Sequence, residues 1–115
     1  SPTMIFDKNG NIHSLTGSPG GTSIIGYVAK SIIGLLDWEM SPQEAINLPH
    51  YMRKKEQTEL EKDTELEKIK EILIKKGHEV SIKRKRSGLH VAKKVDGGYI
   101  GGADIRGEGT IIQID

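Results

Sequence analysis

The sequence contains no cysteine and few aromatic residues. Without cysteine the chain can form no disulfide, no thiolate nucleophile and no thiolate metal site. One Phe, one Trp and three Tyr occur among 115 residues, so Ile, Leu and Val must supply most of the core. No apolar run reaches the roughly 18 residues that a membrane-spanning helix needs, and we expect no membrane span in this chain.

The charges nearly balance, with 17 Lys and Arg against 16 Asp and Glu and a net charge of +1. This balance gives no whole-chain argument for a nucleic acid or an acidic membrane as partner. The local exception is Lys83-Arg84-Lys85-Arg86. No aromatic residues alternate with these basic residues, so the run offers no surface on which the bases of a single-stranded nucleic acid could stack. Binding of a nucleic-acid phosphate backbone remains a lesser alternative. We therefore expect no nucleic-acid partner.

The spacing motifs of common cofactor, metal and nucleophile sites are missing as well. Neither a Walker A loop nor a Gly-x-Gly-x-x-Gly fingerprint occurs, and no serine sits in a nucleophile elbow. The four histidines form no HExxH pattern and no close pair; they are His13, His50, His78 and His90. The sequence therefore predicts no cofactor and no metal.

The first part of the chain predicts a β-hairpin followed by an apolar helix. Residues 3–7 and 12–16 are typical of strands, and Asp7-Lys8-Asn9-Gly10-Asn11 between them favours a hairpin turn. Residues 22–37 are apolar around most of a helical circumference, which predicts a helix buried on more than one side. Ser41-Pro42-Gln43-Glu44 is typical of a helix start with a capping box.

The remaining segments predict further helix and strand. The expected elements are a solvated linker or helix face over 52–62, an amphipathic helix over 63–76 capped by Asp63, a strand over 79–84, a hairpin of strands over 89–95 and 98–103, and a last strand over 109–115. This order predicts an α+β fold in which helices cover an antiparallel sheet. At this length, 1–115 is a single domain or a fragment of one.

Two short segments are candidates for a binding or catalytic site. Gly17-Ser18-Pro19-Gly20-Gly21 links the second strand to the apolar helix, so Gly20 and Gly21 offer two bare backbone N–H groups at a helix N-terminus. Such groups suit an anion or a developing oxyanion, although the local pattern alone favours a plain strand-to-helix turn. Asp104 and Arg106 lie in a glycine-rich segment and form a structural ion pair or line a site, of which we favour the ion pair.

Six segments in the same order resemble the C-terminal part of the small, catalytic subunit of gamma-glutamyltranspeptidases. These segments are Ser1-Pro2-Thr3, Thr16 to Gly21, Asp37-Trp38-Glu39-Met40, Ser41-Pro42-Gln43-Glu44-Ala45, Lys76-Gly77-His78-Glu79-Val80 and Gly98 to Asp104. The chain differs where it has Asn47-Leu48-Pro49-His50-Tyr51 for the family's Asn-Ala-Pro-Arg-Phe, and Asp104-Ile105-Arg106 for Asp-Pro-Arg.

The resemblance implies an N-terminal-nucleophile hydrolase with an αββα sandwich, of which this chain is a part. Such enzymes cleave gamma-glutamyl amides such as glutathione and transfer the glutamyl group to water or an amino acid. A threonine freed by autoproteolysis attacks the amide; in the family it lies upstream of the segment matched by Ser1. Gly20 and Gly21 would form the oxyanion hole, while the rest of the small subunit and the large subunit of the same precursor would be partners. Bacterial members are often periplasmic or extracellular, and a cytoplasmic location also stays open.

The sequence also allows a second hypothesis, from a different class of function. The chain is alternatively a non-enzymatic α+β binding module that contacts a partner through the charged residues of 52–62 or 83–86. A fragment of a sandwich should expose strand edges and an apolar helix face, whereas an independent module should cover them.

Overall fold

The computed structural model describes residues 2–107, apart from the side chain of Thr22, and divides them into two compact units. The larger unit comprises residues 2–48 and 86–107, and the smaller unit comprises residues 49–85. The strand expected over 109–115 lies outside the described residues. The α+β fold class is confirmed, because helices pack on a four-stranded antiparallel sheet in the larger unit.

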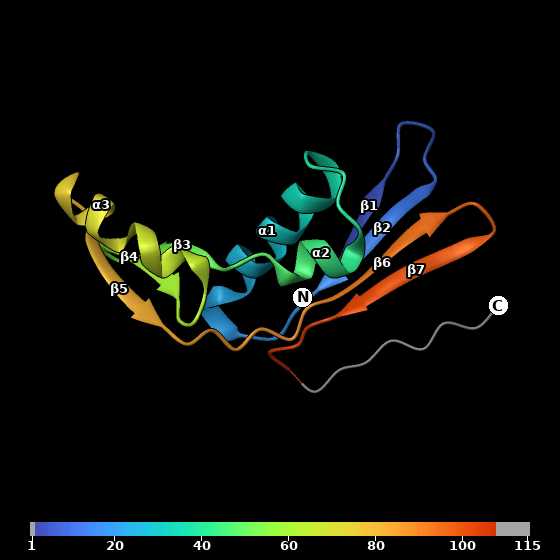
Figure 1. Cartoon of the computed structure of the whole chain (residues 1–115). Coiled ribbons are helices and arrows are strands. Elements are labelled where there is room, and N and C mark those ends of the chain that lie inside the picture. Colours follow the sequence, from blue (N-terminus) through green and yellow to red (C-terminus); the bar gives the residue numbers. More distant parts are fainter. Residues whose placement is uncertain (1, 108–115) are drawn as a thin grey trace. The chain divides into compact units, whose positions relative to one another are not determined.

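The sheet of the larger unit has the strand order β1-β2-β6-β7, and its strands are β1 (Thr3–Phe6), β2 (Ile12–Gly17), β6 (His90–Val95) and β7 (Gly98–Ala103). Both predicted hairpins are confirmed, and Gly10 and Gly97 take positive φ in their turns. Because β2 pairs with β6, the N-terminal hairpin lies beside the C-terminal one (Figure 1).

Two helices pack on one face of this sheet. A 3-10 turn, η1 (Gly21–Ser23), leads into α1 (Ile24–Leu36), and α2 (Pro42–Asn47) follows. Thr16 Oγ1 lies 2.9 Å from Ser31 Oγ of α1, and a Cβ built on Gly102 of β7 would lie 2.9 Å from Gln43 N of α2. Thr16 and Gly102 belong to the same row across the sheet, so both helices cover the same face.

The core of the larger unit lies between these helices and the sheet. Its buried apolar side chains are Tyr27, Val28, Leu35, Ala45, Ile46, Leu89 and Val91. The predicted start of α2 is confirmed: the Ser41 hydroxyl accepts from Glu44 N, and the Glu44 carboxylate accepts from Ser41 N. This hydrogen bond from the Ser41 backbone holds the pKa of Glu44 below its ordinary value.

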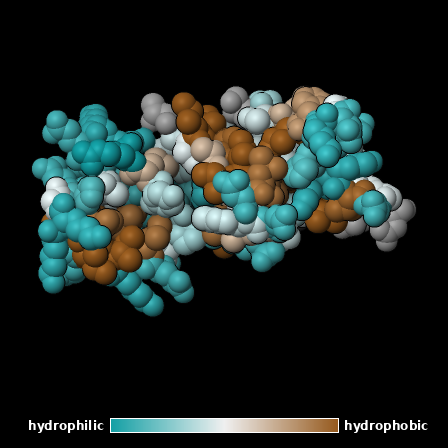
Figure 2. Space-filling model, turned by 90° about the horizontal axis from the view of Figure 1, so that it is seen from above, coloured by the Kyte–Doolittle hydropathy of each residue, from teal (hydrophilic) through white to brown (hydrophobic). Residues whose placement is uncertain are grey.

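The expectation that the apolar helix is buried on more than one side is wrong for the described chain. Buried residues of α1 occupy one face, and Ile25, Ile33 and Leu36 are exposed on the other, with Ile25 at 81%. Figure 2 shows hydrophobic side chains gathered at the surface over the helices of this unit. The apolar face is one of the two features expected of a fragment from a layered sandwich.

The smaller unit contains a three-stranded sheet of order β3-β4-β5, with β3 (Tyr51–Lys54), β4 (Gln57–Glu61) and β5 (Glu79–Lys83). The prediction of a linker or helix face over 52–62 is wrong, because β3 and β4 form an antiparallel hairpin there. Lys55 takes φ 55° in its tight turn, a conformation that glycine or asparagine usually marks in a sequence. The pairing of β4 with β5 is parallel.

The predicted amphipathic helix of the smaller unit is shorter and begins later. Its residues form a 3-10 segment, η2 (Glu65–Ile69), and then α3 (Lys70–Lys75). The predicted cap at Asp63 is wrong: the Thr64 hydroxyl accepts from Leu66 N, and Asp63 takes φ 62°. The end at Gly77 is confirmed, since His78 N donates to Leu73 O at 3.1 Å and closes a Schellman motif around the positive φ of Gly77.

Candidate functional site

The glycine loop connects β2 to η1 in the larger unit. Gly17 is the last residue of β2, and Gly20 and Gly21 take φ 139° and φ 60°. Gly20 also packs closely, because a Cβ on it would lie 2.7 Å from Tyr27 Cε2. Its backbone conformation and the nearby ring both require glycine here.

The two backbone N–H groups of Gly20 and Gly21 make no hydrogen bond to any residue that the structure describes, whereas Gly20 O accepts from Ser23 N at 3.2 Å. Both donors therefore lie at the N-terminal end of η1 and α1, where helix dipoles favour negative charge. This arrangement can bind a small anion or stabilise an oxyanion.

A short polar clasp holds the loop against the segment before β6. The Ser18 hydroxyl donates to Pro19 O at 2.7 Å and accepts from Gly88 N at 3.1 Å. Gly88 lies against the Pro19 ring, so that a Cβ on Gly88 would lie 3.0 Å from Pro19 Cγ and Cδ. We call these contacts among Ser18, Pro19 and Gly88 the Ser18 clasp. The sequence pattern predicts no role for Ser18 or Gly88, although Ser18 lies inside the glycine motif.

The segment that bears Gly88 is fixed by a buried carboxylate. Asp104 is 1% exposed, and its Oδ2 accepts from the Ser87 hydroxyl and from Leu89 N at 3.1 Å. Its Oδ1 accepts from Arg106 N at 2.9 Å and from Arg106 Nη1 at 3.0 Å. The predicted ion pair between Asp104 and Arg106 is therefore present, and it forms part of a larger network.

Burial alone would raise the pKa of Asp104. The Ser87 hydroxyl, the backbone N–H groups of Arg106 and Leu89, and the Arg106 charge together outweigh burial and hold this pKa below its ordinary value of 3.8. Because these interactions favour the charged form, Asp104 is a carboxylate at neutral pH and can accept all of its hydrogen bonds.

Two cations bind the C-terminal end of α2 in the same unit. Lys30 Nζ donates to Ile46 O and Leu48 O at 2.9 and 2.7 Å. Arg106 donates to the same two carbonyls, at 3.0 Å from Nη1 and 3.1 Å from Nη2. These carbonyls carry the negative end of the helix dipole, so Lys30 and Arg106 tie α1 and the 104–106 segment to α2.

Beside the loop, the larger unit has a shallow groove of about 300 Å³ whose lining residues are Pro2, Gly17, Ser18, Pro19, Gly88 and His90. The groove is open and places the Ser18 clasp at its wall. It adjoins the glycine loop through Gly17, Ser18 and Pro19, whereas Gly20 and Gly21 are not among its lining residues.

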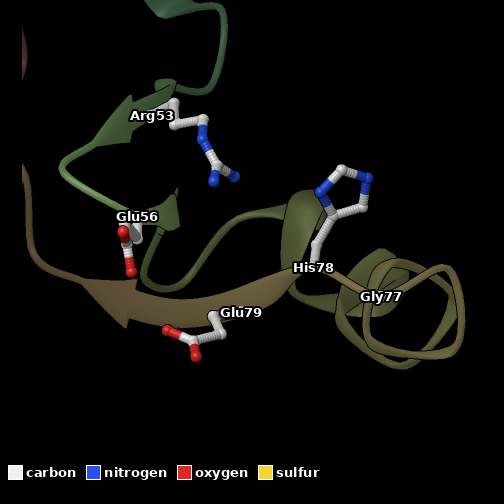
Figure 3. A pocket seen from close by; sticks show the side chains of 5 residues that line it. All are labelled: Arg53, Glu56, Gly77, His78 and Glu79. Carbon is white, nitrogen blue, oxygen red and sulfur yellow. The ribbon is translucent and has the colours of Figure 1, made fainter.

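The smaller unit has a separate open pocket of about 510 Å³, lined by Arg53, Glu56, Gly77, His78 and Glu79. Figure 3 shows that its basic and acidic side chains come from different elements and spread around the opening. Exposed groups of mixed charge that do not converge give this pocket no defined chemistry. Lys85 of the basic run 83–86 is buried in this unit and pairs with Glu59.

The structure brings some of the predicted residues together and leaves others apart. Gly20 and Gly21 lie side by side in one loop, and Asp104 binds the segment that clasps that loop. Within residues 2–107, no three His, Asp or Glu side chains gather to form a metal site. No helix in the same range is long and apolar enough to cross a membrane.

Comparison with known proteins places this geometry in context. Residues 1–114 match the family model described as gamma-glutamyltranspeptidase. The chain is 30% identical over 109 residues to a glutathione hydrolase proenzyme of Escherichia coli K12. This match covers 92% of this chain and 18% of that protein. It is 33% identical over 113 residues to an acylase ACY 1 proenzyme of a Pseudomonas strain, covering 96% of this chain and 20% of that protein.

A solved structure has the same fold. A gamma-glutamyltranspeptidase of Helicobacter pylori, in its T380A mutant form, superposes with a TM-score of 0.83 at 26% identity, over 93% of this chain and 60% of that chain. This likeness confirms the predicted membership in the N-terminal-nucleophile hydrolase fold. The chain spans about a fifth of the length of the curated relatives it matches.

Proposed function

This chain belongs to the gamma-glutamyltranspeptidase family, and we propose that the complete protein containing it cleaves gamma-glutamyl amides such as glutathione. The glutamyl group then passes to water or to an amino acid. In this proposal a threonine elsewhere in the complete protein is the nucleophile, and its α-amine is the base. This chain supplies the backbone N–H groups of Gly20 and Gly21 to the oxyanion of the tetrahedral intermediate.

The observation that carries the proposal is the pair of adjacent N–H groups with no acceptor among the described residues. Both are held on a loop in which Gly20 takes φ 139°, a conformation that residues with a side chain rarely adopt. Donors that are already oriented toward a developing charge stabilise the transition state without reorganisation. Loss of one such donor lowers kcat by about 10²–10³-fold.

The alternative of a non-enzymatic binding module rests on the charged segments 52–62 and 83–86. The structure gives less support to the basic run 83–86 as a binding surface. Lys85 is buried against Glu59, so it adds no exposed charge to the basic run 83–86. The other charged segment, 52–62, forms the hairpin of β3 and β4, whose side chains alternate between the two faces of the sheet. Neither segment presents one continuous basic face.

The test is turnover by the complete protein with matched amides. Glutathione carries a gamma-glutamyl group, and the corresponding glutaryl amide lacks only the α-amino group. Release of glutamate from glutathione, with little cleavage of the glutaryl amide, supports the proposal. Preferred cleavage of the glutaryl amide would instead indicate an acylase, and cleavage of neither amide would reject the proposed activity.

The role of the loop is tested by Gly20→Pro, which removes one N–H donor, and we expect it to abolish turnover. Gly97→Pro is the control, because Gly97 also has a positive φ, 83°, but lies in the turn between β6 and β7. Equal loss in both variants would show that proline strain alone is responsible and would count against Gly20 as an oxyanion donor.

A further inference from the structure

We propose that Ser18 is the positioning residue that aims the Gly20 N–H, an inference that rests on the proposed function of the loop. The reason lies in the peptide bond between Pro19 and Gly20. Its C=O and N–H share one rigid plane and point in opposite directions. A group that fixes Pro19 O therefore also fixes the direction of the Gly20 N–H.

The Ser18 hydroxyl is that group. It donates to Pro19 O at 2.7 Å, and its lone pair accepts from Gly88 N at 3.1 Å. Ser18 is 7% exposed, so water has little access to replace either bond. With both its donor and an acceptor position used, the hydroxyl has one preferred orientation.

The partner of Ser18 is itself held from both sides. Asp104 Oδ2 accepts from Ser87 and from Leu89 N, which are the residues immediately before and after Gly88. Gly88 also packs closely on the Pro19 ring, since a Cβ on Gly88 would lie 3.0 Å from Pro19 Cγ and Cδ. The 87–89 segment, held by Asp104, thus acts on the Pro19–Gly20 peptide through Ser18 and through the Pro19 ring.

A first pair of variants tests the hydroxyl in the complete protein. Ser18→Ala removes both hydrogen bonds of the clasp and keeps every backbone N–H. Because misplacement of a catalytic group by about 1 Å costs on the order of 10²-fold, we expect kcat to fall ~10–100-fold. The KM should stay within about twofold, since the donors act in the transition state. Ser81→Ala is the control: Ser81 Oγ is buried, lies in β5 and has no hydrogen-bond partner among the described residues.

A second pair of variants tests the orientation of the Pro19–Gly20 peptide through steric contact, with the Ser18 hydroxyl left in place. Gly88→Ala puts a Cβ 3.0 Å from the Pro19 ring, which must shift, whereas Gly98→Ala meets no atom within 4 Å. Neither position has a positive φ, so both tolerate alanine in their backbone conformation. We expect Gly88→Ala to lower kcat as Ser18→Ala does, and Gly98→Ala to leave kcat unchanged.

Hydrogen exchange separates this inference from the proposed function. The amide of Gly88 donates to Ser18 Oγ, and the amide of Ser23 donates to Gly20 O at 3.2 Å. Both amides should exchange faster in Ser18→Ala and remain unchanged in Ser81→Ala. If the unmodified protein has no turnover but these amides respond, the proposed function fails while the positioning by Ser18 stands. Unchanged exchange, or unchanged kcat in an active protein, would overturn the inference.

Discussion

Replacing Asp104 by Asn tests the buried network that supports the glycine loop. The carboxylate accepts four hydrogen bonds, two from Arg106 and one each from Ser87 and Leu89. Asparagine keeps one acceptor oxygen, and its NH₂ group would face two donors. At least two of the four bonds are therefore lost, whichever way the amide is turned.

The size of the expected loss in stability follows from the charged hydrogen bonds and the ion pair that the substitution removes. A hydrogen bond to a charged group contributes about 1.5–3 kcal/mol, and breaking a buried ion pair by removal of one partner costs about 3–5 kcal/mol. The residue is 1% exposed, so little water can replace the missing acceptors. We therefore expect Asp104→Asn to lower the free energy of unfolding by about 3–5 kcal/mol at pH 7.

The assay is urea unfolding followed by circular dichroism, with Asp96→Asn as control because Asp96 is exposed and Asn-Gly forms the same turn. The loss of stability in Asp104→Asn should also depend on pH, in a direction that the pKa of Asp104 sets. The pKa of Asp104 is lowered on folding, so the stability that the carboxylate contributes is complete above its unfolded pKa of 3.8 and is lost as the pH falls through the folded pKa. The difference between the unmodified chain and Asp104→Asn should therefore shrink below about pH 4. A loss under about 1 kcal/mol at pH 7 would refute the reasoning.

Two other outcomes follow from single contacts, and a third follows from the proposed function. Gly102→Ala places a Cβ 2.9 Å from Gln43 N, so overpacking against α2 should cost about 1–3 kcal/mol in urea unfolding, whereas Gly98→Ala should cost less. Ser41→Ala removes the N-cap acceptor of α2 and should cost about 1 kcal/mol, and no loss would mean that the capping box contributes nothing. Under the proposed function the nucleophilic threonine belongs to another part of the complete protein, so the 115-residue chain alone should release no glutamate from glutathione; robust release would contradict that proposal.

Much of the larger unit could be predicted because its signals are local. Asn-Gly and Asp-Gly at the two hairpin turns supply residues that adopt positive φ, and Ser41 with Glu44 forms a capping box within one helical turn. The glycine loop was found for the same reason, since its donors are adjacent in the chain. In each case a few neighbouring residues determine the backbone.

The hairpin of the smaller unit was missed because its turn has no such residue. Lys55 takes a positive φ with no glycine beside it, and the charged residues around it are typical of a solvated helix or linker. Its strands are set by pairing, with Leu60 of β4 opposite Ile82 of the parallel strand β5. Long-range pairing of this kind overrides local propensity and has no signature in a short window.

The same division between local and distant contacts explains how the candidate site is built. In the proposed function the chemistry is local, because the two N–H donors belong to consecutive glycines. Their orientation depends on partners far along the chain: Ser18 binds Gly88, 70 residues away, and Arg106 binds Ile46 O, 60 residues away. If the proposed function holds, substitutions in 87–89 and 104–106 should therefore alter the turnover of the complete protein through the orientation of these donors. A site of this design loses activity by misorientation before it loses its reactive groups, which is why the kcat and KM effects must be measured separately.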